Sequence, residues 1–579
     1  MVIIFIIIIF GTKLKNDNSM FKENKNIFQK QFFGFSHLLS KKQREKIMES
    51  KEYFFFKLIV CNIKEKDFKP LFSDDFSRPN SPVNLLVSAL ILKEVNNWTF
   101  KELFENIEFN LLTKTALGLQ NIDQQPFSYT TIFNFKNRIA DYTAKTGINL
   151  FEKNFDALTP AQIKQLKLKT DIQRSDTTMI GVNVRNYSRL ELLIEILIRL
   201  HRDLTETDKL KFSEILSQYT HKTAQNQMYE LKSSDAPKEI EKIAQVYFNL
   251  QNQLQSDVYQ NIESYQNFLR VFQEHFILVE KTITIKENEE LSSSILQSPD
   301  APDASYRYKK GEHHHGLEIF ATETCNPENT VQLITDIAVY QNNVDDTVIL
   351  NERIETIKEK TPDLKQVHTD GGFGNTDNDL LLKELDIVHV QTAVRGRQSE
   401  VEIKIEQIQN SDNYTVSCPY QSIESSKTKK NNKVKFDTEK CAKCPLLQVC
   451  KKAENKGNYY FSENDYLTNK RKNVILSLPL EQRKLRSNVE ATVKELLKGT
   501  NSGKLRVRKT MSVLCYAFNR AISINLGRIY RYFRSKIGFL LQNFSNNIFS
   551  SIFFQKIVDF IFFIVLTLLK REKFFFIKF

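Results

Sequence analysis

The chain is 579 residues long, enough for a sizeable core and about four domains. Its 82 Lys and Arg residues against 69 Asp and Glu give a net charge of +13, which fits binding to a polyanion because neutralised phosphates release condensed counterions. An AT-rich coding sequence is the alternative explanation, since Lys, Phe, Ile and Asn are all abundant. Seven cysteines in a chain of this length exclude a disulfide scaffold.

The two ends of the chain differ from its middle. Residues 1–75 are uneven and rich in Phe and Lys, so we expect an irregular N-terminal extension. The apolar run 2–10 has neither a basic segment before it nor a small-residue cleavage site after it, which argues against a signal peptide. The tail 536–579 is apolar, but its uninterrupted run 560–569 is too short to cross a bilayer. We expect this tail to lie outside the functional fold, with a C-terminal membrane anchor as the alternative.

A helical module is predicted for residues 76–155. After a turn at 78–82, apolar residues recur at helical spacing, and Thr99 with Glu102 forms a capping box. The segment SYTTIFNFKNRI then has the character of the last helix of a helix-turn-helix-like DNA-binding domain. A plain helical bundle with a polar outer face is the alternative. The side chains on this helix that are available to DNA are Tyr129, Thr130, Thr131, Lys136 and Arg138.

The first candidate catalytic acid, Asp176, lies in a short stretch with strand character. The sequence QRSDTTMIG carries this carboxylate toward a strand tip among polar neighbours, and Asp171 is its rival. Helical spacing follows, and we expect a helical insertion over 185–300, with further helices within 237–285. Because no chemistry is evident there, the default role of this insertion is structural or dimerising.

Alternating strands and helices resume after the insertion. Strands are predicted at 316–325, 331–341 and 364–372, a helix at 346–360, and a further strand at 387–393. This order fits an α/β fold, an RNase H-like mixed sheet with helices on its faces, preceded by an all-α N-terminal domain. A carboxylate at the tip of the first strand and one just past the fourth then lie side by side.

Asp370 is the second candidate acid, in the segment LKQVHTDGGFGN. The glycines that follow it allow a sharp turn and a close approach to phosphate. Converging carboxylates supply the hard oxygen ligands that Mg²⁺ takes. Two such ions, about 4 Å apart, can activate the attacking oxygen and stabilise the leaving oxygen of a phosphodiester. The alternative is an ordinary strand-to-helix turn in which Asp370 caps the helix.

The third candidate acid, Glu490, lies in a helix-like segment crowded with cations. A metal-bound scissile phosphate needs cations of this kind along its strand, whereas the alternative is a surface ion pair between Glu490 and Lys494. The cationic residues expected to contact DNA in this segment and just after it are Arg483, Arg486, Lys494, Lys498, Arg506 and Arg508.

A small cysteine-rich insertion is predicted at 396–460. Its four cysteines are Cys418, Cys441, Cys444 and Cys450, with a Cys-x2-Cys pair in the middle. Four thiolates can close a tetrahedral structural Zn²⁺ site with no open position. The spacing is irregular for a zinc ribbon, and unrelated reduced thiols are the alternative.

The order of these features resembles bacterial insertion-sequence transposases of the DDE class. The resemblance covers about residues 75–535, with 165–535 as the catalytic domain, and is carried by QRSDTTMIGVNVRNYSRLELL, LKQVHTDGGFGN and RSNVEATVKELLKGTNSGKLRVRKTMSVLCYAFNRAISINL. Some relatives carry Tyr-x2-Arg-x3-Glu-x6-Lys around the third acid. Here Arg483 stands at the Tyr position and Lys498 comes one residue late, so a hairpin-forming mechanism is not implied.

The resemblance implies that Asp176, Asp370 and Glu490 hold two Mg²⁺ or Mn²⁺ ions, cut the ends of a mobile element and transfer the freed 3′-hydroxyl to target DNA. The implied partners are double-stranded DNA, as terminal repeats and target, and a second copy in a synaptic dimer. The implied location is the bacterial cytoplasm, associated with the nucleoid. A catalytically inactive or co-opted DNA-binding protein derived from a transposase is the alternative.

Overall fold

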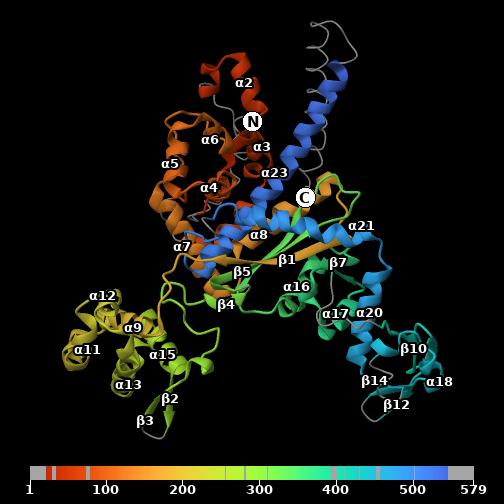
Figure 1. Cartoon of the computed structure of the whole chain (residues 1–579). Coiled ribbons are helices and arrows are strands. Elements are labelled where there is room, and N and C mark those ends of the chain that lie inside the picture. Colours follow the sequence, from red (N-terminus) through yellow and green to blue (C-terminus); the bar gives the residue numbers. More distant parts are fainter. Residues whose placement is uncertain are drawn as a thin grey trace, which may run out of the picture.

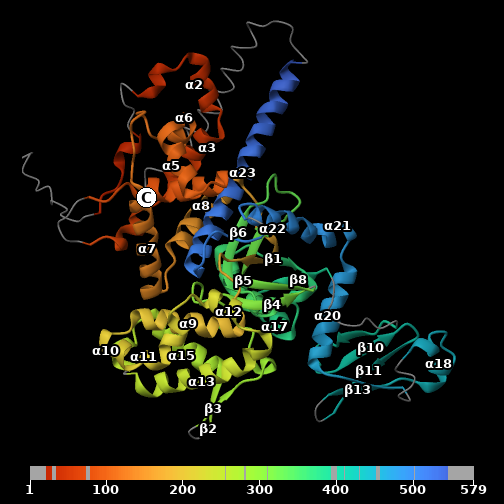
Figure 2. The ribbon, with the colours of Figure 1, turned by 60° about the vertical axis from the view of Figure 1, so that its left-hand side comes forward.

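The protein, seen in a computed structural model, is built around one mixed β-sheet (Figure 1). A helical N-terminal unit, a second helical unit and a small β-rich unit surround this sheet (Figure 2). The structure describes residues 21–28, 34–73, 79–254, 256–279, 282–309, 311–392, 401–409, 411–428, 431–450, 457–500 and 503–545.

The central sheet has six strands in the order β4-β5-β1-β7-β8, with β6 also paired to β5. Strand β1 runs antiparallel to β5 and parallel to β7, and β7 runs parallel to β8. This sheet with its covering helices is a mixed α/β fold, as predicted. The strands are β1 (Ile172–Gly181), β4 (Ser305–Lys309), β5 (Glu312–Thr324), β6 (Ile334–Gln341), β7 (Gln366–Thr369) and β8 (Val388–Gln391).

Each face of the sheet buries its own apolar core. On one face Ile180 and Ile319 pack in a cluster that also contains Phe518 of the long C-terminal helix. On the other face Phe320 and Val367 pack under two helices that follow β6 and β7. Burial on both faces removes apolar surface from water throughout the sheet and holds the strand ends rigid. The covering helices are α23 (Thr510–Ser545), α16 (Asp346–Lys360) and α17 (Thr376–Glu384).

The N-terminal helices share the first of these cores. Leu86, Ile132 and Phe155 belong to the same buried cluster as the strand residues, and α23 contacts both α4 and α8. Helix α23 therefore joins the N-terminal unit to the sheet. The helices of this unit are α4 (Val83–Asn96), α5 (Phe100–Phe109), α6 (Leu111–Ala116), α7 (Tyr129–Thr146) and α8 (Leu150–Leu166).

Part of the expected irregular extension is regular structure. Helices α2 (Lys41–Met48) and α3 (Lys51–Leu58) are capped by Ser40 and Ser50, and Phe55 is buried in the shared core. The expectation for residues 1–75 is wrong for this part, because the Phe-rich stretch gains its regularity by packing against α6. The apolar run 2–10 lies outside the described residues.

The helical insertion has a separate core and ends in a hairpin. Its buried side chains, such as Leu193, Tyr247 and Phe268, form a cluster of their own. The helices expected through residue 285 stop at His275, and the β-branched segments that follow pair as β2 and β3. The elements are α9 (Arg189–Asp203), α10 (Glu206–Lys211), α11 (Ser213–Thr220), α12 (Ala224–Glu230), α13 (Ala236–Gln253), α14 (Ser256–Tyr259), α15 (Glu263–His275), β2 (Phe276–Val279) and β3 (Thr282–Ile285).

The chain after β8 forms a small β-rich unit and then returns to the sheet. Val416, Phe436 and Phe461 form the core of this unit. Among the described residues, no helix is long and apolar enough to span a membrane, and the tail beyond residue 545 lies outside them. The elements are β9 (Lys404–Gln407), β10 (Tyr414–Cys418), β11 (Gln421–Glu424), β12 (Ser426–Lys427), β13 (Asn432–Lys435), α18 (Thr438–Ala442), β14 (Asn458–Phe461), α20 (Glu463–Ser477), α21 (Leu480–Arg483), the 3-10 helix η9 (Lys484–Asn488) and α22 (Val489–Leu497).

Candidate active site

Two of the predicted acids, Asp176 and Asp370, lie on neighbouring strands. Asp370 directly follows β7, whereas Asp176 lies in the middle of β1 and not at its tip as predicted, because β1 continues to Gly181 along β5. Strands β1 and β7 are parallel, with Arg174 opposite His368. Each acid lies two residues farther along its own chain, so the register places the two carboxylates side by side. Their side chains are 12% and 38% exposed, respectively, so one carboxylate is largely buried and the other is open to solvent.

Asp370 also caps the short helical turn that follows it. Its Oδ1 accepts a hydrogen bond of 2.6 Å from the backbone N–H of Gly372. Asp370 therefore caps the turn, as the alternative interpretation of the sequence expected, and it also lies beside Asp176. Because the cap uses Oδ1, the second oxygen, Oδ2, faces the neighbouring acid and its cation.

Arg486 lies between the two acids. Its Nη2 is 3.0 Å from Asp176 Oδ2 and 3.9 Å from Asp370 Oδ2. Its Nε is buried and has no hydrogen-bond partner among the described residues. The sequence predicted Arg486 as a DNA contact and gave no sign of this bridge, which depends on the packing of η9 against β1 and β7.

A further acid, Asp346, lies beside the pair and was missed by the sequence analysis. Thr177 Oγ1 donates a hydrogen bond of 2.7 Å to Asp346 Oδ1, and this carboxylate is buried at the start of α16. Burial raises the pKa of Asp346, and the charge of Asp370 raises it further. In the sequence Asp346 looks like an ordinary residue of a helix N-terminus, so no local signal identifies it.

The site carries more negative charge than its surroundings compensate. Burial raises the pKa of Asp176 from 3.8 to about 6, and Asp370 and Asp346 add to this increase. The guanidinium of Arg486 opposes it without cancelling it. An excess of oxygen donors and negative charge of this kind suits a bound cation.

A buried ion-pair cluster fixes the segment that carries Arg486 and Glu490. Glu323 on β5 accepts hydrogen bonds from Arg174 Nε at 2.6 Å and Arg528 Nη1 at 2.6 Å. Thr492 of α22 donates to the same carboxylate at 2.7 Å, and Arg174 Nη1 also donates to the carbonyl oxygen of Leu485 at 2.6 Å. Burial works to raise the pKa of Glu323, but the two arginines outweigh it and hold that pKa below its usual value. Glu323 therefore stays ionised and holds α22 against the sheet.

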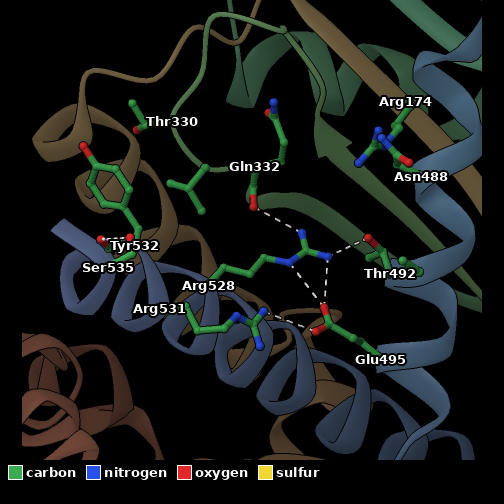
Figure 3. A pocket seen from close by; sticks show the side chains of 12 residues that line it. Arg174, Thr330, Gln332, Asn488, Thr492, Glu495, Arg528, Arg531, Tyr532 and Ser535 are labelled. Atoms are coloured by element: carbon green, nitrogen blue, oxygen red, sulfur yellow. Dashed lines mark hydrogen bonds and ion pairs between the residues drawn. The ribbon is translucent and has the colours of Figure 1, made fainter. Parts of the chain in front are cut away.

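Figure 3 shows a pocket of about 580 Å³ between α22 and α23, next to this cluster. Arg528 points into it from α23 and also contacts Glu495, while the more exposed Arg531 lies 3.4 Å from the same carboxylate. Tyr532 and Ser535 line the other side. The two arginines that α23 contributes to the pocket, Arg528 and Arg531, are therefore engaged in ion pairs.

Glu490 lies on α22, a helix that packs against β1. It is exposed in the first turn of α22, four residues after Arg486. Among the described residues, no group of three or more His, Cys, Asp or Glu side chains is arranged to hold a metal ion. The structure therefore brings Asp176 and Asp370 together and leaves Glu490 on the adjoining helix.

The residues predicted to contact DNA on α7 have several protein contacts. Tyr129 is 52% exposed and packs on the rings of Phe104 and Phe133, and Thr131 hydrogen-bonds the capping Ser128. Lys136 lies over two Phe rings and Arg138 lies over a third. Thr130 is exposed. Aromatic and cationic side chains therefore form a surface on α7 in which Tyr129, Lys136 and Arg138 are held by contacts with Phe rings.

The remaining predicted DNA contacts are spread over two segments. Lys494, Lys498 and Arg506 are exposed. Arg508 donates to the carbonyl oxygen of Asn183 at 3.1 Å and lies 3.4 Å from Asp300. The side chain of Arg483 lies outside the described part of the structure.

The four predicted zinc ligands lie in the β-rich unit. Cys418 ends β10, Cys441 lies in α18, and the N–H of Cys444 donates to the carbonyl oxygen of Cys441 at 3.1 Å. Burial raises the pKa of the Cys441 thiol, and Cys418, Cys450 and Cys444 each add to the increase. Cys418 and Cys441 pack against the same apolar core, and the four cysteines do not form a closed metal site among the described residues.

Comparison with known proteins finds matches to two protein families. Residues 411–530 match the family described as Transposase DDE domain, and residues 42–138 match Transposase domain (DUF772). No curated protein and no solved structure matches the chain. The first match contains Glu490 and the four cysteines, and the second contains most of the N-terminal helical unit. Both matches are to transposase families, and together they support a DDE-type insertion-sequence transposase.

Proposed function

We propose that Asp176, Asp370 and Glu490 are the ligands of two Mg²⁺ or Mn²⁺ ions with which this transposase cuts and joins DNA. The observation that carries the proposal is the pair of carboxylates on the neighbouring strand segments, Asp176 within β1 and Asp370 just past β7, with more negative charge than Arg486 compensates. When bound, the ions would activate the attacking oxygen and stabilise the leaving oxygen of the phosphodiester. The donor oxygens present fit ions of this kind.

The side chains around the pair have separate tasks in this proposal. Asp176 and Asp370 hold the ions, and the hydrogen bond from Thr177 to Asp346 fixes a buried charge beside them. Glu490 completes the set from α22, whose position depends on Glu323. The strand order, with the three parallel strands β1, β7 and β8 beside an antiparallel set, supports an RNase H-like catalytic domain.

The DNA partners follow from the same placement. Transposases act on DNA, and the exposed cations Lys494, Lys498 and Arg506 lie on the segment that follows Arg486. We propose that they contact the backbone of the element ends, and that two copies of the chain hold two ends together. The surface of α7 is the second proposed contact, and the bacterial cytoplasm is the proposed location.

The test is cleavage of duplex DNA that carries the flanking ends of the locus, with Mg²⁺ or Mn²⁺ and with EDTA as the control. Metal-dependent nicks that leave a 3′-hydroxyl, followed by joining to a target duplex, support the proposal. Binding to the ends without cleavage in any metal identifies instead an inactive DNA-binding protein derived from a transposase. The absence of both binding and cleavage contradicts the proposal.

Metal binding is expected to strengthen by about tenfold between about pH 5 and pH 7, because protons compete with the ion for Asp176. The folded-state pKa of Asp176, about 6, lies above its usual 3.8. The contribution of this carboxyl to folding stability is therefore greatest below the usual pKa and is lost as the pH rises through about 6. Calorimetric titration with Mn²⁺ between about pH 5 and pH 7 measures the change in metal affinity. An affinity that does not depend on pH contradicts the prediction.

We also propose that Cys418, Cys441, Cys444 and Cys450 hold one structural Zn²⁺ ion. Their proximity supports this, and four thiolates leave no position for substrate. The purified protein should contain about one zinc ion per chain, and Cys441→Ala should lose it and melt at a lower temperature. Cys61→Ala, which alters a half-buried cysteine elsewhere, should retain the metal. Equal zinc content in wild type and Cys441→Ala contradicts this assignment.

A further inference from the structure

Arg486 is a cation that lies close to both acids of the pair and offsets part of their negative charge. Its Nη2 lies 3.0 Å from one carboxylate oxygen and 3.9 Å from the other, so it spans two residues from different strands. Of the groups that act on Asp176, Arg486 is the main one that favours the ionised carboxylate, while Asp370 and Asp346 disfavour it. Removing this guanidinium leaves like charges facing one another in a partly buried site.

The backbone of Arg486 is fixed, whereas its side chain is held only at the tip. The preceding residue, Leu485, accepts a hydrogen bond of 2.6 Å from Arg174, which is itself fixed by Glu323. The Arg486 side chain is 17% exposed, and its buried Nε has no partner among the described residues. Such a side chain can rotate away from the acid pair, while the hydrogen bond from Arg174 to Leu485 keeps the backbone of η9 in place.

We infer that Arg486 and a divalent ion compete for the Asp176–Asp370 pair, so that the metal enters only when the guanidinium swings out. The inference rests on the proposed function, because it takes this pair as metal ligands. A single guanidinium between both acids blocks the space that they share, and its charge removes part of the attraction for a second cation. The arginine thus keeps the metal-free acids together and lowers their affinity for metal.

DNA is the partner that relieves this competition. A phosphate of the bound backbone gives the departing guanidinium an anion with which it forms strong bidentate hydrogen bonds. Metal and DNA then strengthen each other's binding, because both favour the swung-out arginine and such coupling is reciprocal. The free protein is thereby kept largely without metal until an element end is bound.

The decisive measurement is the affinity for Mn²⁺, alone and without DNA, determined by calorimetry or by the electron-paramagnetic resonance of free Mn²⁺. Arg486→Gln, which removes the charge and shortens the side chain but keeps a polar end, should bind Mn²⁺ about tenfold more tightly than wild type. Arg486→Lys keeps a cation and should stay near the wild-type affinity. Arg199→Gln is the matched control, because Arg199 also bridges two carboxylates, Glu195 and Asp300, but in the helical insertion. It should leave Mn²⁺ binding unchanged.

Melting curves provide a second readout that needs no catalysis. In EDTA, Arg486→Gln should melt below wild type, and Mn²⁺ should raise its melting temperature more than it raises that of wild type. A variant that folds only when Mn²⁺ is present supports the inference as well. Asp176→Asn should weaken Mn²⁺ binding in both the wild-type and the Arg486→Gln background.

The failures of the two ideas are distinguishable. Mn²⁺ binding to Arg486→Gln that is equal to or weaker than wild type overturns the competition and leaves the proposed metal site standing. No Mn²⁺ binding in any variant, or binding that Asp176→Asn leaves unchanged, overturns the proposed metal site and the competition with it.

Discussion

Asp370→Asn is expected to abolish cleavage of the element ends while binding to those ends is kept. The substitution removes one charge and one metal ligand, and losses of at least about a thousandfold are expected when charge stabilisation of this kind is removed. An Asn Oδ1 can still accept the hydrogen bond from the backbone of Gly372, so the turn after β7 should keep its shape. Single-turnover cleavage and equilibrium binding, measured on the same duplex, separate the two effects.

The matched control for this variant is Asp377→Asn. Asp377 lies close to Asp370 in sequence, but its side chain is exposed in the first turn of α17. Its loss should leave cleavage within a few-fold of wild type. Equal losses in both variants, or full activity in Asp370→Asn, count against the assignment of Asp370.

Glu323→Ala is expected to destabilise the catalytic unit by about 3–5 kcal/mol, the usual range for removing one partner of a buried ion pair. Arg174 and Arg528 are then left as buried charges that face each other, and Thr492 loses its acceptor. Because these contacts hold α22 on the sheet, cleavage should fall as well. Chemical denaturation measures the stability, and hydrogen exchange of the α22 amides measures the release of the helix.

Glu495→Ala controls for the loss of a carboxylate at the same arginine. Glu495 contacts Arg528 at 3.1 Å, but its side chain is 33% exposed at the rim of the pocket. Its removal should cost no more than about 1 kcal/mol, as for exposed ion pairs. If Glu323→Ala and Glu495→Ala lower the free energy of unfolding equally, the assignment of Glu323 as the buried anchor of α22 is wrong.

Much of the sheet was predictable from local pattern. The predicted helix at 346–360 coincides with α16, and the strands at 331–341 and 387–393 contain β6 and β8. Strong periodicity and short turns encode such elements locally. The hairpin β2–β3 was missed because apolar β-branched segments after a helix carry no signal that marks the helix end. Helix α3 was missed because its regularity depends on packing with α6.

The sequence by itself determined which residues could do the chemistry. The order of the three acid-bearing segments, with Asp176 and Asp370 in strand-like settings, carried the resemblance to DDE transposases, and the predicted roles of the three acids come from that resemblance. The strand-like runs and the glycine turn after Asp370 are encoded locally, in short stretches of chain.

Only the tertiary structure decided how those residues are held. It placed Arg486 between the acids, brought Asp346 to Thr177, and buried Glu323 between two arginines from distant segments. These contacts join residues far apart in the chain, so their partners depend on strand register and helix docking. The physical reason is that burial and opposite charge act through space, and no local pattern records which groups will meet.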